Sequence, residues 1–113
     1  PQKNPYTGKI VILVDELSGS ASEQFAAGMQ EVGRATVIGK KTEGDDMDAD
    51  LVELPTGAYL IYAAGEPRTP KGVVVEGRGV VPDIEVGLTR AGLLAGRDAQ
   101  LEAAIERIKN GKR

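Results

Sequence analysis

The stretch that decides the fold is residues 9–39, KIVILVDELSGSASEQFAAGMQEVGRATVIG. Residues 9–15 are almost wholly apolar and β-branched, which predicts a buried strand. Residues 20–33 change to helical spacing, and Gly33 is placed to end that helix. Residues 35–39 predict a second short strand. A strand, a helix and a strand within about thirty residues form a βαβ-like unit, so the expected fold class is α/β.

Apolar positions at helical spacing predict which faces of the helices pack inward. In the first helix they are Ala21, Phe25, Met29 and Val32. A second helix is expected near the end of the chain, where Asp98 is a good N-cap and Asn110-Gly111 closes the helix. Its expected buried face consists of Leu101, Ala104, Ile105 and Ile108.

The middle of the chain predicts shorter elements. Residues 40–50 are polar and acidic and predict a loop. A hairpin is expected around Pro55-Thr56-Gly57, whose residues favour a turn. The expected strands are 51–54, 58–63 and 73–76, and one or two helical turns are expected within 89–95.

Composition excludes several classes of function. The chain has 113 residues, a net charge of -3, no cysteine and no histidine. This length fits one small domain, residues 1–113, and the charge gives no reason to expect a nucleic acid or an anionic membrane as partner. We read no signal peptide and no apolar stretch long enough to span a bilayer in these residues, and both points stay open for any upstream sequence. Without histidine, a Ser-His catalytic pair cannot be completed within this chain.

Residues 15–23, DELSGSASE, place serines where the strand gives way to the helix. A serine at such a corner presents its hydroxyl at the edge of the sheet, next to helix N-terminal N–H groups that can stabilise an oxyanion. A structural explanation stands beside this one, because Ser20 and Glu23 have the S-x-x-E spacing of a capping box. Ser18 and Ser22 leave the choice of nucleophile open on spacing alone.

Several motifs together resemble the carboxyl-terminal processing (tail-specific) serine peptidases. The family run is a buried strand, Asn/Asp-Glu-Gly-Ser-Ala-Ser-Ala-Ser-Glu, an apolar helix, Gly-Arg-Ala, a strand and Gly-x-x-Thr-x-Gly. Residues 9–44 match it without a gap. Later matches follow in order: 54–57 (LPTG), 68–70 (RTP), 77–84 (GRGVVPDI) and 95–101 (AGRDAQL).

The resemblance implies a fold, a reaction and a set of residues. The fold would be the crotonase/ClpP-like peptidase core, with this chain as the C-terminal portion of the catalytic domain. The reaction would be serine endopeptidase cleavage of protein or peptide substrates near their C-termini, without a cofactor. Ser20 would be the nucleophile and the Ala21 N–H one oxyanion donor, while the second donor lies outside this chain. The resemblance also allows a homo-oligomer and an extracytoplasmic location.

The sequence departs from the common branch of the family, which uses a Ser-Lys dyad. The lysine is expected at Asp45 and a glutamine at Ala49, and an aspartate is a much weaker base than a neutral amine. In the tricorn-like branch a histidine from upstream sequence and a downstream glutamate serve instead, and Glu76 matches that glutamate. The isolated chain is therefore expected to be inactive. The alternative is a non-catalytic, peptide-binding or scaffolding remnant that has lost its base.

The acidic loop also invites a metal hypothesis. Asp45, Asp46, Asp48 and Asp50 resemble the start of an EF-hand loop. Leu51 stands where that loop needs its glycine, and Gly57 stands where it needs the closing glutamate. We therefore expect no metal at this loop and a solvated surface instead.

Overall fold

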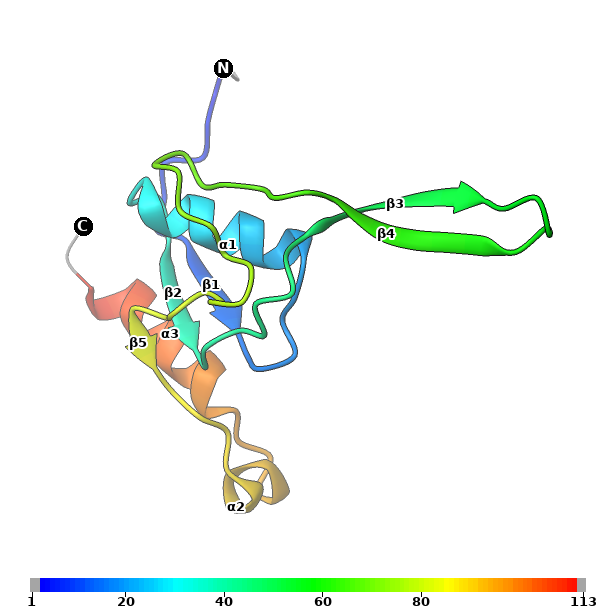
Figure 1. Cartoon of the computed structure of the whole chain (residues 1–113). Helices are drawn as coiled ribbons and strands as arrows, with labels where there is room; N and C mark the ends of the chain where they lie inside the picture. The colour runs from blue at the N-terminus through cyan, green and yellow to red at the C-terminus, as the bar shows by residue number, and fades with distance from the viewer. Residues whose placement is uncertain (1–2, 112–113) are drawn as a thin grey trace.

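The computed structural model describes residues 3–111, which form a small parallel sheet with helices on both faces and a separate hairpin (Figure 1). This arrangement confirms the α/β class. The elements in chain order are β1 (Val11–Val14), α1 (Ala21–Glu31), β2 (Thr36–Gly39), β3 (Asp48–Glu53), β4 (Tyr59–Gly65), β5 (Ile84–Glu85), α2 (Arg90–Leu94) and α3 (Ala99–Asn110).

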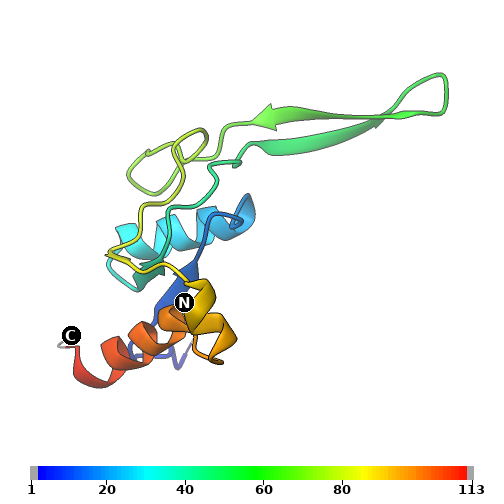
Figure 2. The same ribbon diagram turned by 90° about the horizontal axis from the view of Figure 1, so that it is seen from below.

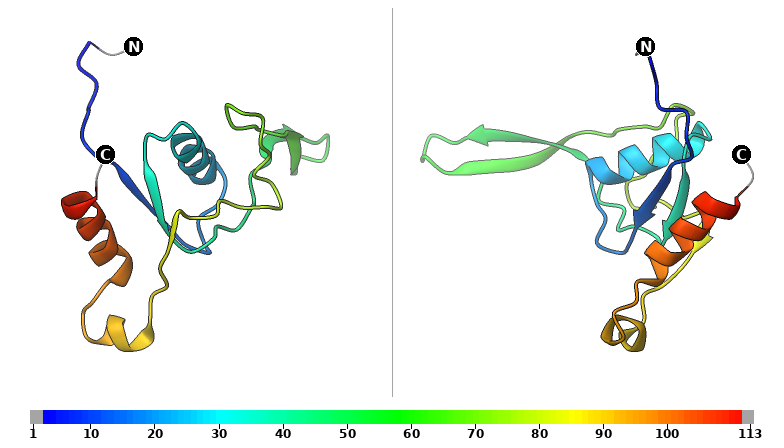
Figure 3. Two further views of the ribbon diagram at one scale, coloured as in Figure 1. Left: turned by 90° about the vertical axis from the view of Figure 1, so that its left-hand side faces the viewer. Right: turned by 180° about the vertical axis from the view of Figure 1, so that it is seen from behind.

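The sheet has the order β1-β2-β5, and its strands are parallel. β1 and β2 pair in register from Val11 with Thr36 to Val14 with Gly39, and α1 connects them, so the predicted βαβ unit is confirmed. Helices α1 and α3 lie on opposite faces of this sheet (Figure 3). Parallel strands are normally covered on both faces in this way.

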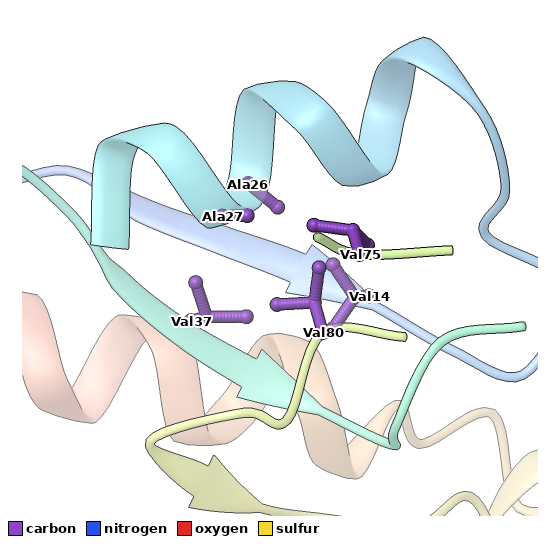
Figure 4. Close-up of a cluster of buried hydrophobic side chains, with 6 residues drawn as sticks. All are labelled: Val14, Ala26, Ala27, Val37, Val75 and Val80. Carbon is purple, nitrogen blue, oxygen red and sulfur yellow. The ribbon is translucent and has the colours of Figure 1, made fainter. Parts of the chain in front are cut away.

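The core lies between α1 and the sheet and is built mostly from small side chains (Figure 4). Its members are Val14, Ala26, Ala27, Val37, Val75 and Val80. Val75 and Val80 come from an irregular segment, and the strand expected at 73–76 is wrong because that segment makes only an isolated bridge between Arg68 and Val74. Its apolar side chains fill the core without joining a ladder.

The hairpin of β3 and β4 stands apart from the sheet and projects from the body in two perpendicular views (Figures 1 and 2). It is longer than predicted, because β3 begins at Asp48 within the expected loop and β4 continues to Gly65. Both of its faces carry exposed apolar side chains. Leu51, Tyr59 and Ile61 are 62%, 63% and 69% exposed on one face, and Val52, Leu60 and Tyr62 are 42%, 47% and 46% exposed on the other.

The helices do not pack by the faces that the sequence predicts. The side of α1 that meets the core carries Glu23, Ala26 and Ala27, while Phe25 and Val32 are 59% and 60% exposed. In α3, Asp98 is the N-cap as expected, accepting from the Leu101 N–H at 2.9 Å. Of its four expected core residues only Ala104 is buried, and Leu101, Ile105 and Ile108 are exposed. The three-stranded sheet is too narrow to cover these larger side chains.

Candidate active site

Ser20 stands at the corner between β1 and α1, as the N-cap of the helix, and is exposed. Its backbone has φ 55° and ψ -136°, and it is the one non-glycine residue with positive φ in the part of the chain that the structure describes. L-residues rarely occupy this region, and doing so costs on the order of 1–3 kcal/mol. Residues held in such a conformation concentrate at functional sites.

The other two serines of the corner are occupied by local hydrogen bonds. The Ser18 hydroxyl donates to Asp15 Oδ1 and accepts the Asp15 N–H, each at 3.0 Å. The Ser22 hydroxyl donates to the Gly19 carbonyl at 2.6 Å. Within residues 3–111 no acceptor takes the Ser20 O–H. Hydrogen bonding thus separates Ser20 from its neighbours where spacing alone could not.

The side chain of Glu23 is fully buried under the serine corner and holds it by hydrogen bonds. Its carboxylate accepts the Ser20 N–H at 3.1 Å, which is the carboxylate half of the capping box. The Glu23 N–H donates to the Ser20 carbonyl at 2.8 Å, so the Ser20 hydroxyl is at most a secondary acceptor for it. The box and an available hydroxyl therefore coexist, and the two explanations of the S-x-x-E spacing are compatible.

The same carboxylate holds the loop at residues 42–45 against the serine corner. It accepts the Thr42 hydroxyl, the Gly44 N–H at 2.8 Å and the Asp45 N–H at 3.1 Å. The Asp45 carbonyl in turn accepts the Ser20 N–H at 2.7 Å. The sequence predicted a cap from Glu23 but missed this wider clamp, whose partners lie some twenty positions further along the chain.

Two glycines let a second loop approach the first. A Cβ on Gly79, at φ 70°, would lie 2.4 Å from the Thr42 carbonyl oxygen, and one on Gly44, at φ 83°, would lie 2.8 Å from the Gly79 nitrogen. The Gly77 N–H donates to the Gly44 carbonyl at 2.8 Å. Only glycine fits these close contacts, which place Glu76 beside the loop that follows Thr42.

Glu76 is half-buried, and its Oε2 accepts the Asp46 N–H at 2.6 Å. The predicted site residues Ser20 and Glu76 are thereby joined through Asp45 and Asp46, although they do not touch. Asp45 itself is exposed, and its backbone alone contacts the corner. Ala49 lies on the exposed strand β3.

Asp46 is buried beside these acids, a feature that the sequence prediction of a solvated loop missed. Its exposed fraction is 3%. Burial raises the pKa of its carboxyl, and the charge of Glu23 raises the pKa further; a hydrogen bond from Gln24 opposes both effects, and Glu76 and Asp48 add smaller increases. Between residues 3 and 111 no group of three or more acidic side chains is arranged to hold a metal ion.

The Ala21 N–H is the first of helix α1, where backbone N–H groups have no partner within the helix. No hydrogen bond described for residues 3–111 uses it. Together with the positive end of the helix dipole, this N–H can stabilise a negative oxygen that forms beside Ser20.

No helix in the described range is long and apolar enough to cross a bilayer.

Known proteins resemble this chain in both sequence and fold. A carboxyl-terminal-processing protease of Synechocystis sp. is 31% identical over 105 residues, covering 90% of this chain and 25% of that protein. The tricorn protease superposes with a TM-score of 0.76 at 28% identity, over 91% of this chain and 11% of its own. The photosystem II D1 C-terminal processing protease gives 0.68 at 26% identity, over 93% of this chain and 26% of its own.

This chain therefore spans about a quarter of the length of these relatives or less. The sequence profile of peptidase family S41 matches residues 1–86, which is most of the chain. The match takes in the serine corner, the 42–45 loop and Glu76. The chain belongs to peptidase family S41.

Proposed function

We propose that this chain is the serine-bearing portion of a catalytic domain that hydrolyses peptide bonds by acyl-enzyme chemistry. The observation that carries the proposal is the conformation of Ser20, which is strained, exposed and set at the N-terminus of α1. Ser20 Oγ attacks the scissile carbonyl, and the Ala21 N–H donates to the resulting oxyanion. The second oxyanion donor comes from outside this chain.

The general base also comes from outside this chain, because the sequence has no histidine and Asp45 occupies the lysine position. The tricorn-like arrangement fits best, with an upstream histidine as base and Glu76 as its acidic partner. Two observations support this choice. The chain superposes on the tricorn protease, and Glu76 accepts a hydrogen bond from the Asp46 N–H, next to the loop that contacts the serine corner. The finer fold proposed is the crotonase/ClpP-like core, of which residues 1–113 form the C-terminal portion.

The proposed substrates are proteins or peptides, cleaved near their C-termini, as the name of the Synechocystis relative describes for that protein. The upstream part of the same catalytic domain is the principal proposed partner. A homo-oligomer is a further proposal. A second candidate function, a non-catalytic peptide-binding remnant, is favoured by the Asp45 position alone, where the expected lysine is missing.

The test is covalent labelling of the protein that carries this chain together with the rest of its catalytic domain. A fluorophosphonate probe should label Ser20, and Ser20→Ala should abolish labelling, while Ser22→Ala should leave it in place. Labelling of the wild type that persists in Ser20→Ala would overturn the assignment. A protein that no serine-directed probe labels would favour the non-catalytic remnant.

The 113-residue chain alone should not hydrolyse peptides, since it lacks the base. Peptide turnover by this chain that disappears in Ser20→Ala would show that a base lies within it. Mass spectrometry of a peptide library after incubation with both forms makes the comparison.

A further inference from the structure

A small open cavity lies at the end of the sheet where β1 and β2 begin. Its volume is about 240 Å³, and its walls come from the segment before β1, the turn between α1 and β2, and α3. Ser20 follows the other end of β1, so the cavity and the candidate active site lie at opposite ends of the sheet. None of the residues between 3 and 111 that line the cavity is acidic.

Three cationic side chains line this cavity. They are Lys9 before β1, Arg34 between α1 and β2, and Arg107 on α3. All three residues are half-buried, and none of them takes part in the ion pairs described for residues 3–111. Removing charge from water costs free energy unless an opposite charge is near, so three such cations around one cavity favour a bound anion.

Two of these cations are held in place by carbonyl groups. Arg34 donates from Nη1 to the Gly8 carbonyl at 3.0 Å and from Nη2 to the Tyr6 carbonyl at 2.6 Å. Lys9 Nζ donates to the Ile108 carbonyl at 2.7 Å. Carbonyl oxygens orient the cations but do not neutralise them, so the positive charge at the cavity is both fixed and unbalanced.

Arg107 offers the donors best suited to an anion. Its Nε contacts Thr36 Oγ1 at 3.4 Å, and no hydrogen bond described for residues 3–111 uses its two Nη atoms. The planar fork of a guanidinium matches two oxygens of a phosphate or a carboxylate. The Thr36 hydroxyl, which also lines the cavity, has its own O–H to donate.

We propose that this cavity binds a small oxyanion with more than one negative charge, inorganic phosphate or a phosphate monoester, between Lys9, Arg34 and Arg107. Charge favours this class, because three cations are matched better by a dianion than by a single carboxylate. Size favours a small ion, since the cavity is below the range of about 300–1,000 Å³ that is usual for larger ligands. The bound ion would connect the segment before β1 to α3 and so strengthen the packing of α3 on the sheet.

The first measurement is an NMR titration of the 113-residue chain with inorganic phosphate, at neutral pH and constant ionic strength. The amide signals of Gly8, Gly33 and Thr36 should shift and reach saturation, because these residues line the cavity. Acetate should bind more weakly, since it carries one charge. Phenyl phosphate distinguishes the two sources of the ligand: tighter binding than inorganic phosphate indicates an ester, and weaker binding indicates the free ion.

Variants of Arg107 test whether the ion binds at this cavity. Arg107→Gln should weaken phosphate binding about tenfold or more, which corresponds to the loss of a hydrogen bond to a charged group. Arg107→Lys keeps the charge and should retain part of the affinity, which also covers the case in which the glutamine variant does not fold. Arg90→Gln, the same chemical change on an exposed residue of α2, should bind phosphate like the wild type.

Calorimetric titration of the protein that carries the rest of the catalytic domain completes the test, and phosphate should bind there as well. Absence of saturable phosphate binding to the 113-residue chain would overturn the proposal, as would equal affinities for phosphate and acetate. Unchanged phosphate affinity in both Arg107 variants would place the ion elsewhere and so contradict the proposal. Binding that is lost in the larger protein would also overturn it, because the cavity would then be covered by another part of the domain.

Discussion

At the scale of single residues, the serine corner combines a strained backbone with a buried carboxylate that maintains it. Ser20 has φ 55°, and its N–H is shared between Glu23 Oε2 and the Asp45 carbonyl. Two acceptors on one N–H fix the peptide orientation, so hydrogen bonds to Glu23 and to the 42–45 loop offset the strain. The strained conformation that exposes the Ser20 hydroxyl therefore lowers the folding stability of the chain.

Ser20→Gly should therefore stabilise the 113-residue chain, by about 1 kcal/mol. Glycine adopts this φ without the steric cost of a Cβ, and it loses only part of that gain through greater freedom of the unfolded chain. Ser20→Ala is the matched control, because it also removes the hydroxyl but keeps the Cβ and the strain. Urea unfolding of the three proteins measures the difference; equal stability of the glycine and alanine variants would show that the corner is unstrained.

Glu23→Gln should destabilise the chain by about 1.5–3 kcal/mol, the range for hydrogen bonds to a charged group. The carboxylate accepts from four donors, and an amide would turn its own NH₂ toward some of them. Glu43→Gln, the same change on an exposed side chain of the same loop, should cost little. A small loss for Glu23→Gln in urea unfolding would mean that water replaces the carboxylate.

Asp46 should make the stability of the 113-residue chain fall as pH rises. Its pKa is raised in the folded state by burial and by Glu23, so the folded chain binds this proton more tightly than the unfolded chain does. The contribution of Asp46 is therefore most favourable below the ordinary Asp pKa and is lost as pH rises through the raised pKa. In Asp46→Asn this part of the profile should be flat, so the advantage of the variant in urea unfolding should grow with pH and then level off. An advantage that shrinks as pH rises would contradict the sign.

At the scale of elements, the body and the hairpin differ in what supports them. Strands β1 and β2 lie between α1 and α3, and Val37 and Ile38 are fully buried. The hairpin has only its own ladder, and isolated two-stranded hairpins are marginally stable in water. Packing, more than hydrogen bonding, thus distinguishes the two parts.

Hydrogen exchange should reveal this difference in the 113-residue chain. Amides of β3 and β4 should exchange far faster than those of Val37 and Ile38, because they can open without disturbing the core. Mass spectrometry of peptides covering residues 48–65 and 36–39 compares them. Equal protection would mean that the hairpin is covered, for example by a second copy of the chain.

What the sequence predicted well follows from local signals. The β-branched run at 9–15, the helix after Ser20 and the Asp98 cap each depend on neighbours in sequence, and all three were found. The predicted faces of α1 and α3 were wrong because amphipathic spacing predicts that apolar sides are covered, and Phe25, Leu101 and Ile105 are uncovered in the 113-residue chain. The burial of Asp46 could not be predicted either, since it results from contacts of its loop with Gln24 and Glu76 that no local pattern encodes.

At the scale of the whole molecule, the chain exposes more surface and is more extended than a compact protein of the same mass. Its accessible surface is 7951 Å² at 11.9 kDa, whereas a compact monomer of that mass exposes about 6,000 Å². Its radius of gyration is 17.4 Å, against about 13 Å for a compact domain of this length. The projecting hairpin and the uncovered apolar side chains of α1 and α3 contribute to this excess, and the remainder of the catalytic domain proposed above would cover them.

The 113-residue chain should therefore self-associate as its concentration rises, driven by the exposed face of Leu51, Tyr59 and Ile61. The double variant Leu51→Lys/Ile61→Glu should weaken association in analytical ultracentrifugation, because these residues are opposite each other in the ladder and would form a cross-strand ion pair at unchanged net charge. The control is Leu93→Lys/Leu94→Glu in α2, which also replaces two exposed leucines but leaves the hairpin intact. If both double variants reduced association equally, exposed apolar area in general would drive association. A wild-type chain that stayed monomeric at all concentrations would mean that the hairpin folds back onto the body.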